Sequence, residues 1–351
     1  MKPISLYFLL LFSLISCSRS KPSVKEAYQK EAPGTSFGLT EKINGITFVA
    51  PPRPFTENPM TDITNVGANW IAVVPYAFTR PDVPDVHYSE DGKHWWGERP
   101  VGIKESIRLA HKDNLKVMVK PQVWIPRGWT GSLEFPTDSA WTAWENAYER
   151  YILRLAGLAD TMKAELFCIG TEFNKSLQQR PQFWQQLIPK IKSLYHGPLT
   201  YSANWDDWDK VPFWNELDYI GLGSYFPLVD TPMPEVKELQ QAWKPICNKL
   251  KAFSMEKQKP VLFTEWGYLS VDGCGWQNWE LEKILKTCSI NQQAQANCME
   301  AMLSTFHHEE WWAGSFLWKW YPEMRGHEGS PERDYTPQGK MAEAVLRKWY
   351  K

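Results

Sequence analysis

Short apolar segments alternate with longer amphipathic segments from residue 43 onward. Apolar runs rich in aromatic and β-branched residues predict buried strands over 43–49, 69–76, 115–123, 165–172, 198–205, 217–225, 260–266 and 312–320. The amphipathic segments predict helices over 101–113, 139–162, 181–195, 235–255, 291–310 and 336–349, with Pro181 in a first-turn position. Strands that alternate with helices indicate parallel βαβ units. We therefore predict the α/β class, as a single catalytic (β/α)8 TIM barrel over residues 43–351.

The competing fold for this pattern is a doubly wound open sheet. That fold relies on a glycine-rich phosphate-binding turn after its first strand. Here the turn reads Ala-Pro-Pro-Arg-Pro over 50–54, which lacks the backbone N–H groups that a phosphate needs. The two longest connections, 77–100 and 267–290, both follow strand ends. They place tryptophans on the mouth face of a barrel, as candidate cleft walls.

The N-terminus has the pattern of an export signal rather than of a folded element. Lys2 precedes an apolar stretch over 4–15, which is too short to cross a bilayer. The following Leu-Ile-Ser-Cys resembles a bacterial lipoprotein signal. That resemblance implies a signal peptide over 1–16, lipidation of Cys17, a flexible tether over 17–42 and an exported, membrane-anchored protein. An ordinary secretory signal is the alternative.

Composition and charge narrow the choice of partners. A net charge of −1 gives no support to nucleic-acid binding, which favours a basic face. The 20 tryptophans exceed what a core needs, and they suit a cleft for sugar rings. Cys168 lies within a predicted strand, and an oxidising compartment would allow disulfides among Cys247, Cys274, Cys288 and Cys298. We expect a monomer without metal or cofactor.

Two predicted strands end in a glutamate followed by an aromatic residue, Glu172 and Glu265. A carboxylate at the end of a buried strand is costly unless it has a function. The two residues are 93 positions apart, which is about three βα units of a barrel with roughly 31 residues per unit. They therefore fit strands four and seven, with both side chains at one mouth. Two such carboxylates can cleave a glycosidic bond, although the spacing does not distinguish retaining from inverting chemistry.

Strict alternation along these strands makes a further prediction. If Glu172 faces the barrel interior, Gly170 and Cys168 face it too, while Thr171 faces the helices. If Glu265 faces the interior, so do the residues at 261 and 263.

The segments Gly170-Thr171-Glu172-Phe173 and Thr264-Glu265-Trp266-Gly267 resemble glycoside hydrolase family 113, within the clan of retaining TIM-barrel glycosidases. The resemblance covers about residues 43–350. It implies endo-β-1,4-mannanase activity on mannan or glucomannan, with Glu172 as acid/base and Glu265 as nucleophile. Most clan members have asparagine where this chain has Thr171, so the sugar contact of that asparagine must come from elsewhere or be absent.

Further mouth residues follow from the same placement. The resemblance implies that Tyr225 hydrogen-bonds the nucleophile and that Trp318 forms an aromatic platform, although neighbouring aromatic residues leave the register of Trp318 open. Lys120 and Gln122 end strand three, with Trp124 beyond it, and a lysine in this apolar strand needs a polar partner. Asn204 ends strand five, either to bind a sugar hydroxyl or to cap a turn.

Two alternatives stay open at this point. One keeps the mechanism but takes β-glucan or another β-glycan as its substrate. The other is a surface glycan-binding protein without catalysis, although such proteins usually lack one of the two carboxylates. Endo and exo action are not distinguished by the sequence.

Overall fold

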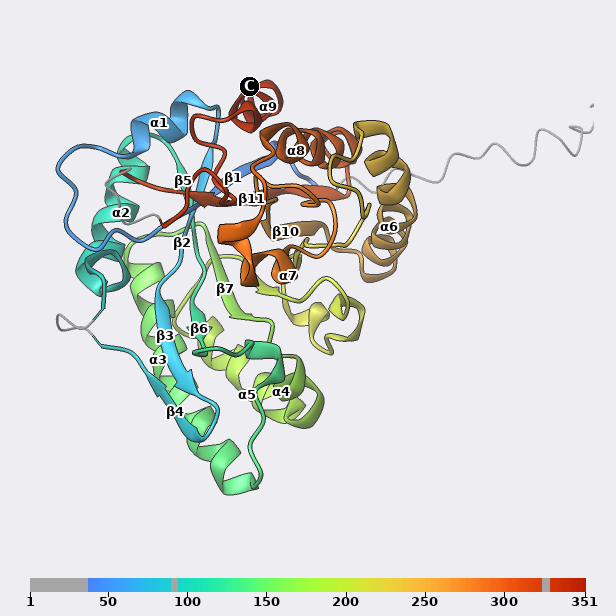
Figure 1. The fold of residues 1–351 in the computed structure, drawn as a ribbon. Helices are drawn as coiled ribbons and strands as arrows, with labels where there is room; N and C mark the ends of the chain where they lie inside the picture. The colour runs from blue at the N-terminus through green and yellow to red at the C-terminus, as the bar shows by residue number, and fades with distance from the viewer. Residues whose placement is uncertain (1–36, 90–93, 324–328) are drawn as a thin grey trace, which may run out of the picture. The chain divides into compact units, whose positions relative to one another are not determined.

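The computed structural model describes residues 37–89, 94–323 and 329–351. Eight strands form one parallel sheet, in agreement with the predicted (β/α)8 barrel (Figure 1). In barrel order they are β1 (Ile43–Phe48), β2 (Trp70–Val73), β5 (Lys116–Val119), β7 (Leu166–Thr171), β8 (Leu199–Ser202), β9 (Ile220–Gly223), β10 (Val261–Trp266) and β11 (Trp312–Trp320). The predicted signal peptide, Cys17 and the tether up to residue 36 lie outside the described residues.

Backbone hydrogen bonds around Ala203 close the barrel. The Ala203 amide donates to the Gly221 carbonyl at 3.0 Å, and the Gly223 amide donates to the Ala203 carbonyl at 2.8 Å. These bonds join the end of β8 to β9, the two outer strands of the ladder order. The fourth and seventh barrel strands are therefore β7 and β10, which bear the two glutamates at their carboxyl ends.

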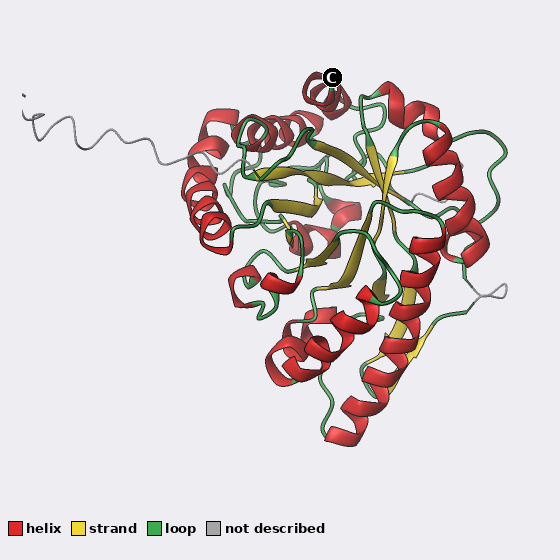
Figure 2. Ribbon diagram, turned by 180° about the vertical axis from the view of Figure 1, so that it is seen from behind, coloured by secondary structure: helices red, strands yellow, loops and turns green. Residues whose placement is uncertain are grey.

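Helices lie outside the strands (Figure 2). The longer ones match the predicted segments: α2 (Pro100–Lys112), α3 (Asp138–Thr161), α5 (Pro181–Lys192), α6 (Val236–Lys257), α8 (Gln292–Phe306) and α9 (Met341–Tyr350). Three six-residue helices were not predicted: α1 (Met60–Asn65), α4 (Asn174–Gln179) and α7 (Asn278–Lys283). A helix of this length has too few turns to show a periodic apolar face.

Local sequence signals explain where several helices begin. Helix α3 starts after Thr137, whose side chain accepts a hydrogen bond from the Ala140 amide at 3.2 Å. Helix α6 has a capping box between Glu235 and Glu238. Helix α5 begins at Pro181, as expected for proline in a first turn.

A second, three-stranded sheet was not predicted. It contains β4 (Val83–His87), β3 (Tyr76–Arg80) and β6 (Gln122–Trp124), in that order. The sequence predicted single strands over 69–76 and 115–123, but Pro75 and Pro121 interrupt both of them. Proline cannot donate to a ladder, so each barrel strand ends before its proline and a new strand follows. The connection 77–100 is therefore partly a hairpin, which lies beside α3 (Figure 1).

The two core layers show which residues face inward. The barrel interior holds Ile43, Trp70, Ala72, Met118, Leu166, Cys168, Leu262, Ala313 and Phe316. A larger apolar layer fills the space between the strands and the helices. Alternate residues of each strand enter the two layers, as the two-residue period of a strand requires.

Strand β7 departs from strict alternation immediately before Glu172. Cys168 faces the barrel interior, and the ladder register then shifts between Cys168 and Thr171. A Cβ on Gly170 would lie 2.9 Å from the ring of Trp184, on the helix side. The prediction that Gly170 faces the interior was therefore wrong. Thr171, predicted to face the helices, lines the mouth cavity instead.

Strand β10 behaves in the same way. Val261 and Phe263 belong to the outer layer, whereas Leu262 faces the interior. The register then shifts between Phe263 and Glu265, and Glu265 reaches the mouth. The predicted interior positions of Val261 and Phe263 were wrong, because one shift reverses the face of every residue before it.

The cysteines of the described segments are all free thiols, so none of the disulfides that an oxidising compartment would allow is formed in this structure. Cys274 and Cys298 are buried with their sulfur atoms 3.9 Å apart. Cys168 is buried, as predicted. Within the described residues, no helix combines the length and the apolar character needed to cross a membrane.

Candidate active site

A cavity of about 200 Å³ lies at the carboxyl ends of the barrel strands and contains both glutamates. Glu172 directly follows β7, and Glu265 is the fifth residue of β10. The cavity is lined by Tyr76, Gln122, Val123, Trp124, Ile125, Gly128, Trp129, Thr130, Thr171, Glu172 and Glu265. The predicted meeting of the two carboxylates at one barrel mouth is therefore present in the structure.

Glu265 receives hydrogen bonds from three side chains. The Tyr225 hydroxyl donates to Oε1 at 2.8 Å, and the Gln122 amide donates to Oε2 at 3.1 Å. The Lys120 ammonium also donates to Oε2 and forms an ion pair with it. Charge-assisted hydrogen bonds favour the ionised carboxylate. This environment prepares Glu265 to act as an anion.

Lys120 is fully buried, with a side-chain exposure of 0 %. It follows β5, and its ammonium lies 5.9 Å from the centre of the Trp318 ring as well as against Glu265. A buried charge requires a partner, because its desolvation is otherwise costly. The carboxylate and the electron-rich face of the indole supply that partner. Lys120 is thus committed to the mouth site rather than to the core.

Glu172 has different surroundings. Burial raises its pKa to about 7, and the neighbouring charges of Glu265 and Asp207 act in the same direction. The Trp129 indole N–H donates to Oε2 at 2.6 Å and acts in the opposite direction, as does the Lys120 cation. A carboxyl with this pKa is protonated over much of the range up to neutral pH. Glu172 can therefore carry a proton near neutral pH and deliver it.

The backbone at Glu172 is also unusual. Its φ is 56°, in the left-handed region that residues other than glycine seldom occupy. The Glu172 amide donates to the Ser202 carbonyl at 2.8 Å, which holds this conformation against the neighbouring strand. Such outliers concentrate at functional sites.

The remaining predicted site residues fall into two groups. Tyr225 and Lys120 contact Glu265, and the Trp318 ring lies beside the Lys120 ammonium. Trp124 lines the cavity and is 54 % exposed, as a sugar-binding platform would be. The Asn204 amide instead donates to Asp206 at 2.9 Å, which is the turn-capping arrangement. Among the contacts of the described residues, none joins Asn204 to either glutamate.

Trp129 and Tyr76 also line the cavity and were not predicted as site residues, whereas Gln122, predicted to end strand three at the mouth, lines it as well. Trp129 lies in a turn-rich segment, Pro-Arg-Gly-Trp-Thr-Gly over 126–131. A tryptophan between glycines immediately after a strand end could have signalled an exposed aromatic at the mouth. Tyr76 was not recognised as the start of a strand in a second sheet, because the predicted strand over 69–76 ran through the proline before it.

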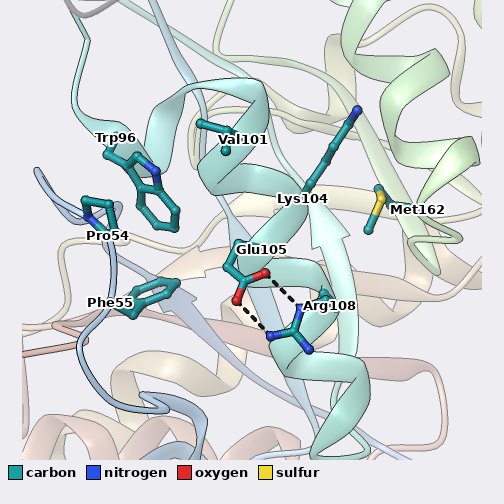
Figure 3. Close-up of a pocket in the computed structure, with 8 residues that line it drawn as sticks. All are labelled: Pro54, Phe55, Trp96, Val101, Lys104, Glu105, Arg108 and Met162. Carbon is teal, nitrogen blue, oxygen red and sulfur yellow. Dashed lines mark hydrogen bonds and ion pairs between the residues drawn. The ribbon is translucent and has the colours of Figure 1, made fainter.

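A separate cavity of about 400 Å³ lies between the chain after β1 and helix α2 (Figure 3). Its lining is Pro54, Phe55, Trp96, Val101, Lys104, Glu105, Arg108 and Met162, none of which lines the mouth cavity. Its charged groups are already paired in part, since Arg108 donates twice to Glu105 at 2.8 Å. In the described part of the chain, no cluster of three or more His, Cys, Asp and Glu side chains could hold a metal ion.

Comparison with known proteins agrees with this geometry. The model of Glycoside Hydrolase Family 113 matches residues 52–340. The GH113 β-mannanase AaManA from Alicyclobacillus acidocaldarius, solved in complex with ManMIm, is similar with a TM-score of 0.77 and 25 % identity, covering 90 % of this chain and 98 % of that one. A GH113 β-1,4-mannanase complex gives a TM-score of 0.75 at 25 % identity, covering 89 % and 99 %.

More distant structures share only the fold. The Ruminococcus gnavus β-glucuronidase has a TM-score of 0.58 at 11 % identity, covering 88 % of this chain and 50 % of that one. No curated protein matches the chain.

Proposed function

The chain belongs to glycoside hydrolase family 113, and we propose that it is a retaining endo-β-1,4-mannanase that acts on mannan or glucomannan. The substrate is inferred from the solved β-mannanases that resemble it over nearly the whole of their own chains. The observation that carries the mechanism is the contrast between two carboxyls of one cavity. Glu265 is held as an anion by three donors, whereas burial raises the pKa of Glu172 to about 7.

In the first step, a carboxylate oxygen of Glu265 attacks the anomeric carbon of the sugar. The bond from that carbon to the glycosidic oxygen breaks, and this oxygen takes the proton of Glu172 as the leaving sugar departs. The products are a glycosyl ester on Glu265 and an ionised Glu172.

In the second step, Glu172 acts as a base. It takes a proton from water while the water oxygen attacks the anomeric carbon. The ester bond breaks, the Glu265 carboxylate is restored, and Glu172 is again protonated. Two inversions at one carbon leave the configuration of the product unchanged.

The other mouth residues are assigned supporting roles. Lys120, Gln122 and Tyr225 hold the Glu265 carboxylate in one orientation. Trp124 and Trp318 offer aromatic faces for sugar rings, whose C–H faces pack on indole. Asn204 is better suited to shaping the β8 turn than to binding sugar, because its amide is engaged by Asp206.

The experiment is reducing-sugar release from mannan, glucomannan, xylan and β-glucan. Wild type is compared with Glu265→Ala and Glu172→Ala, and proton NMR of the first product reports its anomeric configuration. We expect release from the mannans, a retained β-anomer, and loss of release in both variants. Circular dichroism of both variants checks that they fold.

Each of the remaining outcomes would contradict a specific part of the proposed function. Unchanged release from either variant would remove that glutamate from the mechanism, and an initial α-anomer would replace retention by inversion. Release from β-glucan but not from mannan would change the substrate and keep the chemistry. Binding of mannan by the wild type without release from any glycan would indicate a glycan-binding protein.

We also propose that the protein is an exported lipoprotein, anchored through Cys17 and active as a monomer. The support for export and the lipid anchor is the sequence alone: a basic residue, a short apolar stretch and Leu-Ile-Ser-Cys before a polar segment. Metabolic labelling with a radioactive fatty acid should mark the wild type and not Cys17→Ser. Equal labelling of both would refute the anchor, and gel filtration of residues 37–351 tests the monomer.

A further inference from the structure

We propose that Trp129 is a positioning residue that determines which oxygen of Glu172 carries the catalytic proton. The inference depends on the proposed role of Glu172 as the acid. It concerns a residue of the loop after β6, and it assigns Trp129 a function beyond lining the cleft.

The first observation is the contact itself. The Trp129 indole nitrogen lies 2.6 Å from Glu172 Oε2, a short N–H to carboxyl hydrogen bond. The indole is also 42 % exposed, so its place in the structure is not explained by core packing.

The second observation is that the loop is built to hold this indole. Arg127, two residues before Trp129, has a left-handed φ of 58°. The Thr130 hydroxyl donates to the Val123 carbonyl at 3.1 Å, and the Ser132 hydroxyl donates to the Trp129 carbonyl at 2.8 Å. The indole packs against Gly131 so closely that a Cβ there would lie 2.4 Å from its ring. Any larger residue at position 131 would displace the donor.

The chemistry of the donor fixes the location of the proton. Indole N–H can only donate, so the oxygen that faces it must act as an acceptor in both protonation states of Glu172. The carbonyl oxygen of a protonated carboxyl is a stronger acceptor than its hydroxyl oxygen, so this contact favours the acid proton on Oε1. Oε1 lies 3.3 Å from the position that a Cβ on Gly223 would take, on the β9 side. Two residues further along the chain, Tyr225 contacts Glu265, so the proton faces the side of the nucleophile.

The other groups that face Glu172 do not provide this selection. Glu265 of β10 and Asp207 after β8 raise its pKa through their charge, and Lys120 after β5 lowers it. The buried Tyr201 hydroxyl of β8 accepts a hydrogen bond from the Phe173 amide at 2.7 Å. Within the described residues, the Trp129 indole supplies the side-chain hydrogen bond to the Glu172 carboxyl.

The test replaces Trp129 by phenylalanine, which keeps an aromatic ring and removes the N–H. On mannan we expect kcat/KM at its acidic plateau to fall about tenfold, because the proton is no longer favoured on Oε1 and the carboxyl loses its fixed orientation. The alkaline midpoint of kcat/KM should rise by about one pH unit, because a hydrogen bond to the ionised carboxylate is lost. With 2,4-dinitrophenyl β-mannoside, whose leaving group needs no proton, the loss should stay within about twofold.

A readout without substrate separates this inference from the proposed function. Carbon-13 NMR of labelled glutamate carboxyls, with Glu172 assigned by comparison with Glu172→Gln, should show its titration midpoint about one pH unit higher in Trp129→Phe. Equal midpoints in wild type and variant would overturn the inference, even if the enzyme cleaved mannan. If wild type cleaved no glycan, the proposed function would fail, and the NMR midpoints would still decide the role of Trp129.

The chain offers a matched control. Trp349 donates its indole N–H to Glu300 Oε2 at 3.0 Å, on helices α9 and α8. Trp349→Phe therefore removes a tryptophan–glutamate hydrogen bond outside the mouth cavity. It should leave both pH midpoints at the wild-type value. A shift of the same size in this control would show that the effect of Trp129→Phe is a general loss of packing, and it would overturn the inference.

Discussion

Glu172 and Glu265 are the same residue type at the ends of two barrel strands, yet their surroundings oppose each other. Glu265 is contacted by an ammonium, an amide and a hydroxyl. Glu172 has one indole donor, and burial together with the charges of Glu265 and Asp207 raises its pKa to about 7. The difference teaches that the division of labour between the two is set by neighbours that come from other strands.

The two sites also depend on each other. The Glu265 charge contributes to the raised pKa of Glu172, so an ionised Glu265 helps to keep Glu172 protonated. Lys120 acts on both: it pairs with Glu265 and partly offsets the effect of that charge on Glu172. Changes on one side of the cavity should therefore be detectable on the other.

Removing the anionic side of the pair should have the largest effect. Glu265→Gln keeps the shape of the side chain but cannot form the glycosyl ester, so mannan hydrolysis should fall by about 10⁴-fold or more. Because the Glu265 charge is lost, the pKa of Glu172 should also fall, and carbon-13 NMR can measure this. A residual rate within tenfold of wild type would exclude Glu265 as the nucleophile.

Removing the cation should have the next largest effect. Lys120→Met fills similar space without charge and leaves the Glu265 carboxylate with two neutral donors. We expect kcat/KM on mannan to fall about 100-fold, the usual loss when a preorganised charged group is removed. Steady-state kinetics measure the loss, and thermal unfolding checks the fold. Wild-type activity in a folded variant would show that the ion pair is only structural.

The pH profile tests the acidic side directly. The proposed general acid is the protonated form of Glu172, so the titration of this group should leave kcat/KM unchanged well below pH 7 and lower it about tenfold per pH unit well above it. The same raised pKa makes the contribution of Glu172 to stability greatest below its unfolded pKa, and this contribution is lost as pH rises through 7. An alkaline midpoint that stays unchanged in Glu172→Gln would assign the limb to another group.

The smallest effect is expected for one neutral donor to Glu265. Tyr225→Phe removes the 2.8 Å hydrogen bond to Oε1 and keeps the ring. A single neutral hydrogen bond supports a loss of about fivefold in kcat. A loss as large as that of Lys120→Met would mean that the hydroxyl, rather than the cation, holds the nucleophile in place.

The sequence by itself determined the barrel and the location of its chemistry. Apolar strands that alternate with amphipathic helices permit few other folds, and the 93-residue spacing of two strand-end glutamates placed them on strands four and seven. Tyr225 and Lys120 could be predicted as mouth residues because each ends a strand. These signals are local, because each depends only on which short segments of the chain are buried.

Only the tertiary structure decided the details that separate the two glutamates. The register shifts in β7 and β10 reversed the predicted faces of Gly170, Val261 and Phe263, because a shift depends on the neighbouring strand. The indole donor to Glu172 comes from Trp129, 43 residues earlier in the chain. Neither effect leaves a periodic trace in the sequence, since both arise where distant segments meet in space.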